Sequence, residues 1–151
     1  MIFREATKED FEQAYDIEQS CFVDPYPRQQ LVYEFEENPL NKIVVAVDKD
    51  KIVGFIDYMV TFNSATIIQI AVINEYRKQG IATKLLKEME NSFPKDIEDV
   101  VENVTLEVRE TNEAARNLYK KNGYEEVVVK KHYYKDGENA IYMVKRMLLC
   151  Q

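Results

Sequence analysis

The chain has 151 residues, the size of one ordinary domain, so the sequence predicts a single domain spanning residues 1–151. Acidic residues outnumber basic ones by 27 to 20, and the resulting net charge of −7 argues against direct nucleic-acid binding by the surface as a whole. Hydrophobic residues make up 46% of the chain, which is enough to fill a core and excludes intrinsic disorder.

No apolar stretch approaches the roughly 20 residues that a membrane helix requires, and the charged start MIFREATKED does not resemble a secretory signal. Cys21 and Cys150 stand far apart without a framework spacing, so reduced thiols are expected. These features predict a soluble cytoplasmic protein without membrane association. The one histidine, His132, cannot build a His-rich catalytic metal site, and no Cys-x-x-Cys pair replaces it.

The first predicted elements are a short strand at residues 1–4 and a helix that runs to about residue 20. Thr7 followed three residues later by Asp10 is a helix-start signal, and apolar residues from Phe11 onward recur at helical spacing. Two prolines then interrupt the chain, and a second helix is expected to end before Asn38.

Three runs rich in β-branched residues come next and predict three strands, the first two joined by a short turn. An antiparallel meander is therefore expected. From Gly80 the apolar period becomes helical, and this helix should end by Pro94. The three predicted strands are residues 43–47, 52–60 and 66–73.

The last third of the chain predicts a strand at residues 104–108, then a helix with Asn112 as its N-terminal cap and Gly123 at its C-terminal end. Two final strands, 124–132 and 140–147, should form a hairpin. The order β-α-α-β-β-β-α-β-α-β-β predicts a mixed α/β fold (α+β), in which about four helices pack on a mostly antiparallel sheet of about seven strands.

A basic loop joins the third β-branched run to the helix that follows Gly80. A helix N-terminus offers unpaired N–H groups and partial positive charge, and Arg77 and Lys78 add formal charge, so this segment suits a phosphate group. Taken alone, an ordinary strand-to-helix turn with solvated side chains is the simpler interpretation. The glycine patterns of a Walker loop and of a dinucleotide fingerprint are both absent.

Three segments of the sequence, residues 77–82, 106–124 and 133–143, resemble one known family. Arg77-Lys78-Gln79-Gly80-Ile81-Ala82 resembles the Arg/Gln-x-x-Gly-x-Gly/Ala loop with which GNAT N-acetyltransferases hold the pyrophosphate of acetyl-coenzyme A, and the element order agrees with that fold across nearly all of the chain. The RimI-type ribosomal-protein alanine N-acetyltransferases resemble the chain at Leu106-Glu107-Val108-Arg109, at Asn112 through Gly123-Tyr124, and at Tyr133-Tyr134-x-Asp136-Gly137-Glu138-x-Ala140. Two departures, Asn139 in place of the usual Asp and Pro25-Tyr26 in place of Pro-Trp, concern the acceptor.

The resemblance implies acetyl-coenzyme A as the acetyl donor, and the shortage of histidine and cysteine ligands leaves no metal expected. Backbone groups of the strand before the loop would pair with the pantetheine arm, and the loop and helix start would hold the pyrophosphate. Asn112, by itself a helix cap, would add a contact. The implied donor-binding residues are Ile70, Ala71, Val72, Arg77, Lys78, Gln79, Gly80, Ile81, Ala82, Thr83 and Asn112.

Two candidate catalytic residues follow from the same resemblance. Strand alternation places Glu107 on the face opposite the apolar Leu106 and Val108. The resemblance implies that Glu107 is the general base, acting directly or through a water, and that Tyr119 protonates the departing thiolate. From the residues alone, a solvent-facing carboxylate paired with Arg109 or a lysine is the simpler interpretation of Glu107, and a core tyrosine is the simpler interpretation of Tyr119.

Tyr26, Tyr33 and Tyr134 are candidate acceptor-binding residues, although each is also compatible with half-buried packing. An α-amine has a pKa of about 7.8 against about 10.4 for lysine, so a base removes the proton of an N-terminal amine more easily than that of a lysine. The resemblance implies direct transfer, in a ternary complex, to a protein N-terminus, expected to be the N-terminal alanine of a basic small-subunit ribosomal protein. A small amine such as a polyamine or an antibiotic, or a non-catalytic acyl-coenzyme A module, is the alternative. A monomer or weak dimer is expected, and no role is assigned to Gly54.

Overall fold

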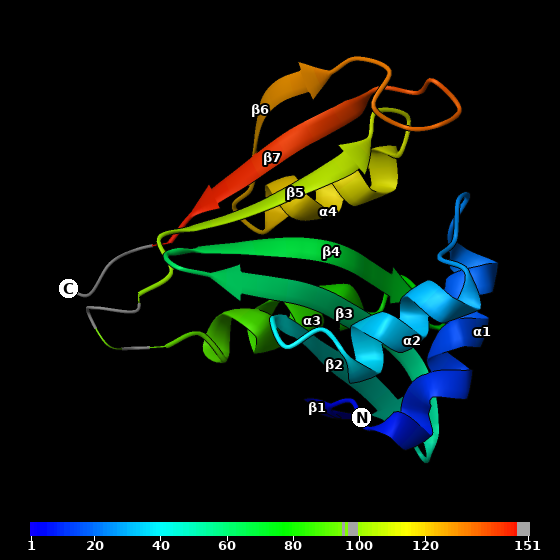
Figure 1. Cartoon of the computed structure of the whole chain (residues 1–151). Coiled ribbons are helices and arrows are strands. Elements are labelled where there is room, and N and C mark those ends of the chain that lie inside the picture. The colour runs from blue at the N-terminus through cyan, green and yellow to red at the C-terminus, as the bar shows by residue number, and fades with distance from the viewer. Residues whose placement is uncertain (95, 97–99, 148–151) are drawn as a thin grey trace. The chain divides into compact units, whose positions relative to one another are not determined.

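The computed structural model describes residues 1–94, 96 and 100–147, so Cys150 lies outside the described residues. Within them, four α-helices accompany seven strands, as the sequence predicts, and the strands are hydrogen-bonded in the order β1-β2-β3-β4-β5-β7-β6 (Figure 1). The chain divides into two compact units. Unit 1 comprises Met1–Met59 with Ile67–Phe93, and unit 2 comprises Val60–Thr66 with the described residues from Pro94 onward.

Unit 1 contains the N-terminal strands and three helices. Strand β2 pairs antiparallel with β1 and with β3, which confirms the first part of the predicted meander. Figure 1 shows α1 and α2 against one face of these strands and α3 against the other. The elements are β1 (Ile2–Glu5), α1 (Phe11–Cys21), α2 (Arg28–Glu36), β2 (Asn41–Asp48), β3 (Lys51–Thr61), β4 (Ser64–Val72) and α3 (Ile81–Asn91), of which the β3 end and the β4 start fall in unit 2.

The core of unit 1 has an apolar cluster on the side of α1. Ala14 and Ile17 of α1 are buried in one cluster with Val45 and Phe55 from the central strands. At the start of the chain, the Thr7 N–H donates to Asp10 Oδ2 at 2.6 Å, which confirms the predicted start signal, although a short 3-10 helix (Lys8–Asp10) precedes α1. The helices therefore bury their apolar stripes against a sheet that is covered on both faces.

Gly54 is required by a close approach of two strands. A Cβ built at this position would lie 2.7 Å from the carbonyl oxygen of Ala71 and 3.2 Å from Val72 Cγ2. Any side chain would push β3 away from β4 at Ala71 and Val72, two of the residues predicted to bind the donor. Gly54 thus supports the strand that carries them.

A buried carboxyl group interrupts the apolar run of β3. Asp57 is 0% exposed, and Asn41 Nδ2 donates a 2.6 Å hydrogen bond to its Oδ1, whereas Oδ2 has no hydrogen-bond partner among the described residues. Burial, with added repulsion from Glu34 and Glu18, raises the Asp57 pKa to about 8. Folding therefore favours the protonated form of this side chain.

We predict that Asp57→Asn raises the stability of the protein at neutral pH. The folded-state pKa lies above the unfolded value, so the wild type loses stability as pH rises from about 4 to about 8. The amide oxygen of the introduced side chain keeps the bond from Asn41 without a charge, for a gain of roughly 2–4 kcal/mol at pH 7. Urea unfolding at several pH values measures this, with the exposed Asp24→Asn as control. An unchanged pH slope in Asp57→Asn would contradict the prediction.

Unit 2 is a small sheet covered by one helix. Residues Ser64–Thr66 pair parallel with the start of β5, and β7 pairs antiparallel with both β5 and β6, so the sheet is mixed as predicted. The strand predicted at 124–132 is shorter, because the chain turns after Lys130 and His132 adopts a positive φ of 54°. The elements are β5 (Asn103–Arg109), α4 (Glu113–Lys121), β6 (Glu125–Lys130) and β7 (Ala140–Arg146).

The predicted ends of α4 are confirmed. Asn112 Oδ1 accepts a 3.1 Å hydrogen bond from the Ala115 N–H, and Gly123 adopts a φ of 96° just beyond the helix. Along β5, Val104, Leu106 and Val108 are buried while the residues between them are half-buried, as the alternation predicts. The apolar face of β5 thus forms the core of unit 2.

Candidate active site

The basic loop of unit 1 adopts a conformation suited to an anion. It follows β4 and a short 3-10 helix (Asn74–Tyr76), and Lys78 and Gly80 have positive φ values of 63° and 80°. The Lys84 N–H donates to the Gly80 carbonyl at 3.1 Å, so the N–H groups at the start of α3 have no carbonyl one helical turn earlier. These groups and the helix dipole favour negative charge at this end of α3.

The loop also leaves room for a ligand. A Cβ built at Gly80 meets no atom within 4 Å, and residues 77–80 are exposed. Arg77 braces the loop, because its Nε donates to the Val72 carbonyl at 2.9 Å and its guanidinium reaches Cys21 Sγ at 3.6 Å. Lys78 adds a further cation. The residues present therefore fit the pyrophosphate of a coenzyme A thioester.

Glu107 is paired with a lysine. It lies on β5 in unit 2 with 23% of its side chain exposed, and Lys130 Nζ is 2.9 Å from its Oε2. The ammonium also lies 4.7 Å from the ring centroid of Tyr142 and 5.4 Å from that of Tyr133. From the residues alone, an ion pair with a lysine is the alternative to a catalytic role, and the structure shows such a pair. The role of Glu107 as a base stays a prediction.

Tyr119 is a buried phenol on α4. Its ring is 5% exposed and packs edge-to-face on Tyr124 at a centroid distance of 5.7 Å. Burial raises the Tyr119 pKa further above its usual value of about 10, and Tyr134 adds a smaller rise. The side chain is therefore protonated at neutral pH, and burial makes it a weaker acid than an exposed phenol.

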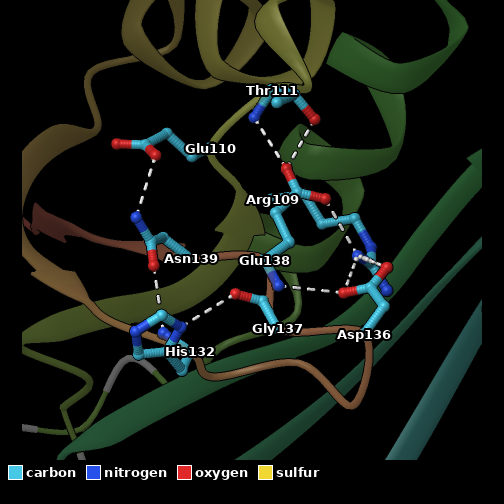
Figure 2. Close-up of polar contacts among 8 residues, drawn as sticks. All are labelled: Arg109, Glu110, Thr111, His132, Asp136, Gly137, Glu138 and Asn139. Carbon is cyan, nitrogen blue, oxygen red and sulfur yellow. Dashed lines mark hydrogen bonds and ion pairs between the residues drawn. The ribbon is translucent and has the colours of Figure 1, made fainter.

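The connection between β6 and β7 is tied to the end of β5 by a polar network (Figure 2). Arg109 Nη1 lies 2.9 Å from Asp136 Oδ2 and 2.9 Å from Glu138 Oε1. Glu138 also accepts hydrogen bonds from the N–H and the hydroxyl of Thr111. Together these donors lower the Glu138 pKa to about 2, so the network persists at neutral pH.

Asn139 forms a second set of contacts beside this network (Figure 2) and concerns one departure from the family pattern. Its Nδ2 donates to Glu110 Oε1 at 3.1 Å, and its Oδ1 accepts from the His132 N–H at 3.0 Å. An aspartate at this position would set one carboxylate against another, because Glu110 requires a donor. Asn139 and Glu110 are thus complementary as hydrogen-bond donor and acceptor.

The candidate acceptor tyrosines of unit 1 lie in different settings. The Tyr26 N–H donates to Glu18 Oε2 at 2.9 Å, and Gln69 Nε2 donates to the same oxygen at 2.7 Å, so Glu18 fixes the connection between α1 and α2. Glu18 is fully buried, and burial raises its pKa. Tyr33 is 43% exposed on α2.

Comparison with known proteins identifies the family. Residues 11–124 match the acetyltransferase (GNAT) family, which is well over half of the chain. The chain belongs to the GNAT acetyltransferase family. It is accordingly an N-acetyltransferase, and its sequence resembles in particular the RimI-type members.

Two relatives and one solved structure illustrate the similarity. A putative ribosomal protein bS18-alanine N-acetyltransferase of Bacillus subtilis is 33% identical over 137 residues, 89% of this chain and 88% of the relative. An N-alpha-acetyltransferase of Sulfurisphaera tokodaii is 34% identical over 152 residues, 93% and 89% of the two chains. The crystal structure of the ribosomal-protein-S18-alanine N-acetyltransferase of Escherichia coli superposes with a TM-score of 0.84 at 25% identity, over 99% of this chain and 96% of the other.

Within the GNAT chain, the structure groups the candidate residues in two sets. The donor loop and Tyr26 and Tyr33 belong to unit 1, whereas Glu107, Tyr119, Tyr134 and Asn112 belong to unit 2. Among the described residues, no helix is long and apolar enough to span a membrane, and no group of three or more His, Cys, Asp or Glu side chains could hold a metal ion.

Several residues of these sets were not singled out from the sequence. Arg109, Thr111 and Glu138 form the network described above, and Glu138 and Arg109 lie in segments that already matched the family. Glu18 and Lys130 gave no signal, since a glutamate in a helix and a lysine at a strand end are ordinary surface residues in a single sequence.

We predict that Gly80→Ala weakens acetyl-coenzyme A binding about fivefold to tenfold. A φ of 80° costs an L-residue roughly 1–2 kcal/mol, so the loop without ligand relaxes away from the binding conformation. Gly80→Asn is the matched control, because asparagine tolerates this region better and should lose less affinity. Isothermal titration calorimetry gives the dissociation constants without an acceptor. Equal affinity for wild type and Gly80→Ala would refute a role for the left-handed conformation.

Proposed function

We propose that this enzyme transfers an acetyl group from acetyl-coenzyme A to the α-amine of a protein N-terminus, by direct transfer in a ternary complex. The observation that carries the proposal is the similarity, at about one third identity, to relatives named N-alpha-acetyltransferase and bS18-alanine N-acetyltransferase. The candidate base Glu107 and the candidate acid Tyr119 lie in the same unit. A site for an amine acceptor needs both groups.

Glu107 is the general base of the proposed reaction. An acceptor α-amine is mostly protonated at neutral pH, and it can attack a thioester only after losing that proton. Glu107 accepts the proton directly or through a water. An α-ammonium, with a pKa of about 7.8, gives up its proton far more readily than a lysine side chain.

Tyr119 is the general acid. The donor supplies an acetyl group already activated as a thioester, so the remaining requirement is a proton for the sulfur when the C–S bond breaks. The Tyr119 phenol holds its proton at neutral pH, and this is the proton that the leaving thiolate would receive. Ile70, Ala71 and Val72 would orient the pantetheine arm, and residues 77–83 with Asn112 would hold the rest of the donor.

The proposed acceptor is the N-terminal alanine of a basic small-subunit ribosomal protein. Relatives that are about one third identical carry the name bS18-alanine N-acetyltransferase, and the net charge of −7 complements a basic partner. Tyr26, Tyr33 and Tyr134 are the proposed acceptor contacts. The family match spans parts of both units, which supports one acetyltransferase domain. A cytoplasmic location, a monomer or weak dimer, and no nucleic-acid or membrane partner stay predictions.

A substrate panel tests the proposed function. The enzyme is incubated with acetyl-coenzyme A and peptides that begin with alanine, N-terminally blocked lysine peptides, or polyamines, and thiol release is followed. Alanine-starting peptides should give the highest kcat/KM. Preference for polyamines would replace the proposal with small-amine acetylation, and donor binding without turnover of any acceptor would indicate a non-catalytic module.

We predict that Glu107→Gln lowers kcat by roughly 10²–10⁴ with little change in acetyl-coenzyme A affinity, because the substitution removes the proton acceptor, together with the charge that pairs with Lys130. Single-turnover kinetics and calorimetry separate the two quantities. Glu125→Gln, an exposed glutamate of β6, is the control and should keep wild-type turnover. Near wild-type turnover in Glu107→Gln would remove this residue from the mechanism.

We predict that Tyr119→Phe lowers kcat by about tenfold or more, because the substitution keeps the ring packing and deletes the transferable proton. Tyr124→Phe is matched to it, since both rings are buried and contact each other. Steady-state kinetics with an alanine-starting peptide should show the loss in Tyr119→Phe alone. Equal turnover in the two variants would count against Tyr119 as the acid.

A further inference from the structure

Arg109 lies beneath the β6–β7 connection. It is the last residue of β5, and the antiparallel register sets it opposite Ala140, the first residue of β7. Its side chain is 15% exposed. The guanidinium carbon lies 4.1 Å from the ring centroid of Tyr134, within the range of a cation–π contact. A cation is therefore packed directly on a proposed acceptor contact.

The same guanidinium crosslinks the connection to β5. Asp136 and Glu138 lie on either side of Gly137, and both accept hydrogen bonds from Arg109 Nη1 (Figure 2). The Glu138 N–H also donates to Asp136 Oδ1 at 3.0 Å. One nitrogen of Arg109 thus holds two carboxylates of one turn, while the guanidinium carbon lies over the ring of Tyr134.

Tyr134 has little freedom within this arrangement. Its N–H donates to the Glu138 carbonyl at 3.2 Å, and its own carbonyl accepts from the Gly137 N–H at 2.9 Å. Its ring packs edge-to-face on Tyr133 at a centroid distance of 5.1 Å. Residues 135–137, by contrast, are largely open to solvent, so the contacts of Arg109 and Glu138 hold an otherwise open turn.

We infer that Arg109 is a positioning residue for the acceptor. It fixes the ring of Tyr134 and the turn at Asp136 and Glu138, so that the acceptor meets a preformed surface instead of ordering it on binding. The inference rests on the proposed function, because it takes Tyr134 as an acceptor contact. A lysine is expected to replace Arg109 only in part, since its ammonium can bond the two carboxylates but it lacks the delocalised guanidinium that lies over the Tyr134 ring.

This role affects the two substrates differently. Loss of Arg109 frees the connection, so part of the acceptor's binding energy is spent on ordering it and the acceptor KM rises. Most of the proposed donor contacts, residues 70–72 and 77–83, lie in unit 1, and the Asn112 side chain is held by its own bond from the Ala115 N–H, so donor affinity should change little. A residue needed only for folding would lower both affinities together with the melting temperature.

The test compares Arg109→Gln, Arg109→Lys and wild type in full-length protein. In Arg109→Gln, the KM for an alanine-starting peptide should rise about tenfold, with kcat within about threefold and the acetyl-coenzyme A dissociation constant within about twofold. Hydrogen exchange of amides 131–139, followed by mass spectrometry, should become about tenfold faster. Arg109→Lys should recover less than half of each change. Arg4→Gln is the control, since Arg4 forms a bidentate pair with Asp10 in unit 1 and should leave acceptor KM and exchange at 131–139 unchanged.

Three outcomes would overturn the inference: an unchanged acceptor KM, unchanged exchange at residues 131–139, or full recovery in Arg109→Lys. The exchange measurement needs no substrate, so it is decisive even if wild type acetylates none of the peptides. Absence of peptide acetylation by wild type would refute the proposed function, and with it the acceptor role of Arg109. Faster exchange in Arg109→Gln would still show that Arg109 orders the β6–β7 connection.

Discussion

The antiparallel pairing of β5 with β7 is the constraint on which the chemistry of unit 2 depends. It sets Glu107 opposite Tyr142 and Arg109 opposite Ala140, with Leu106 and Val108 on the apolar face. A slip of one residue would exchange the two faces and bury the charged side chains. The core of unit 2 and the placement of the proposed base are therefore fixed by the same register.

Local patterns predicted most of the elements, because strand alternation, helix caps and turns depend on residues that are close together in the sequence. Asn112 as a cap, Gly123 beyond the helix end and the outward face of Glu107 all follow from such short-range signals. The identity of the lysine that pairs with Glu107, Lys130, does not follow from such signals. A bulge between Glu126 and Val128 shifts the alternation of β6 so that Lys130 shares a face with Glu107, and a single sequence carries no mark of this shift.

Long-range contacts limited the prediction in unit 1 as well. Gly54 has an ordinary place in a strand until β4 is brought alongside, where Ala71 leaves no space for a Cβ. Asp57 occurs in a β-branched run, and only the packing of α1 and α2 over β3 makes it a buried acid beside Glu18 and Glu34. The family resemblance supplied roles for site residues, but not the network through which Arg109 and Glu138 support them.

Charge is distributed to suit two different partners. The chain carries an excess of acid, with 27 acidic and 20 basic residues, yet the proposed site for the anionic donor combines Arg77, Lys78 and the start of α3. A local basic loop on an acidic protein lets one molecule bind an anionic donor and a basic acceptor.

The central claim, that the acetyl group is transferred to an N-terminal α-amine, is tested most directly by locating the product. One peptide that begins with alanine and contains internal lysines is incubated with enzyme and acetyl-coenzyme A, and tandem mass spectrometry maps the added acetyl group. The account predicts acetylation on the first residue alone. Acetyl groups on the lysines with a free N-terminus would contradict it.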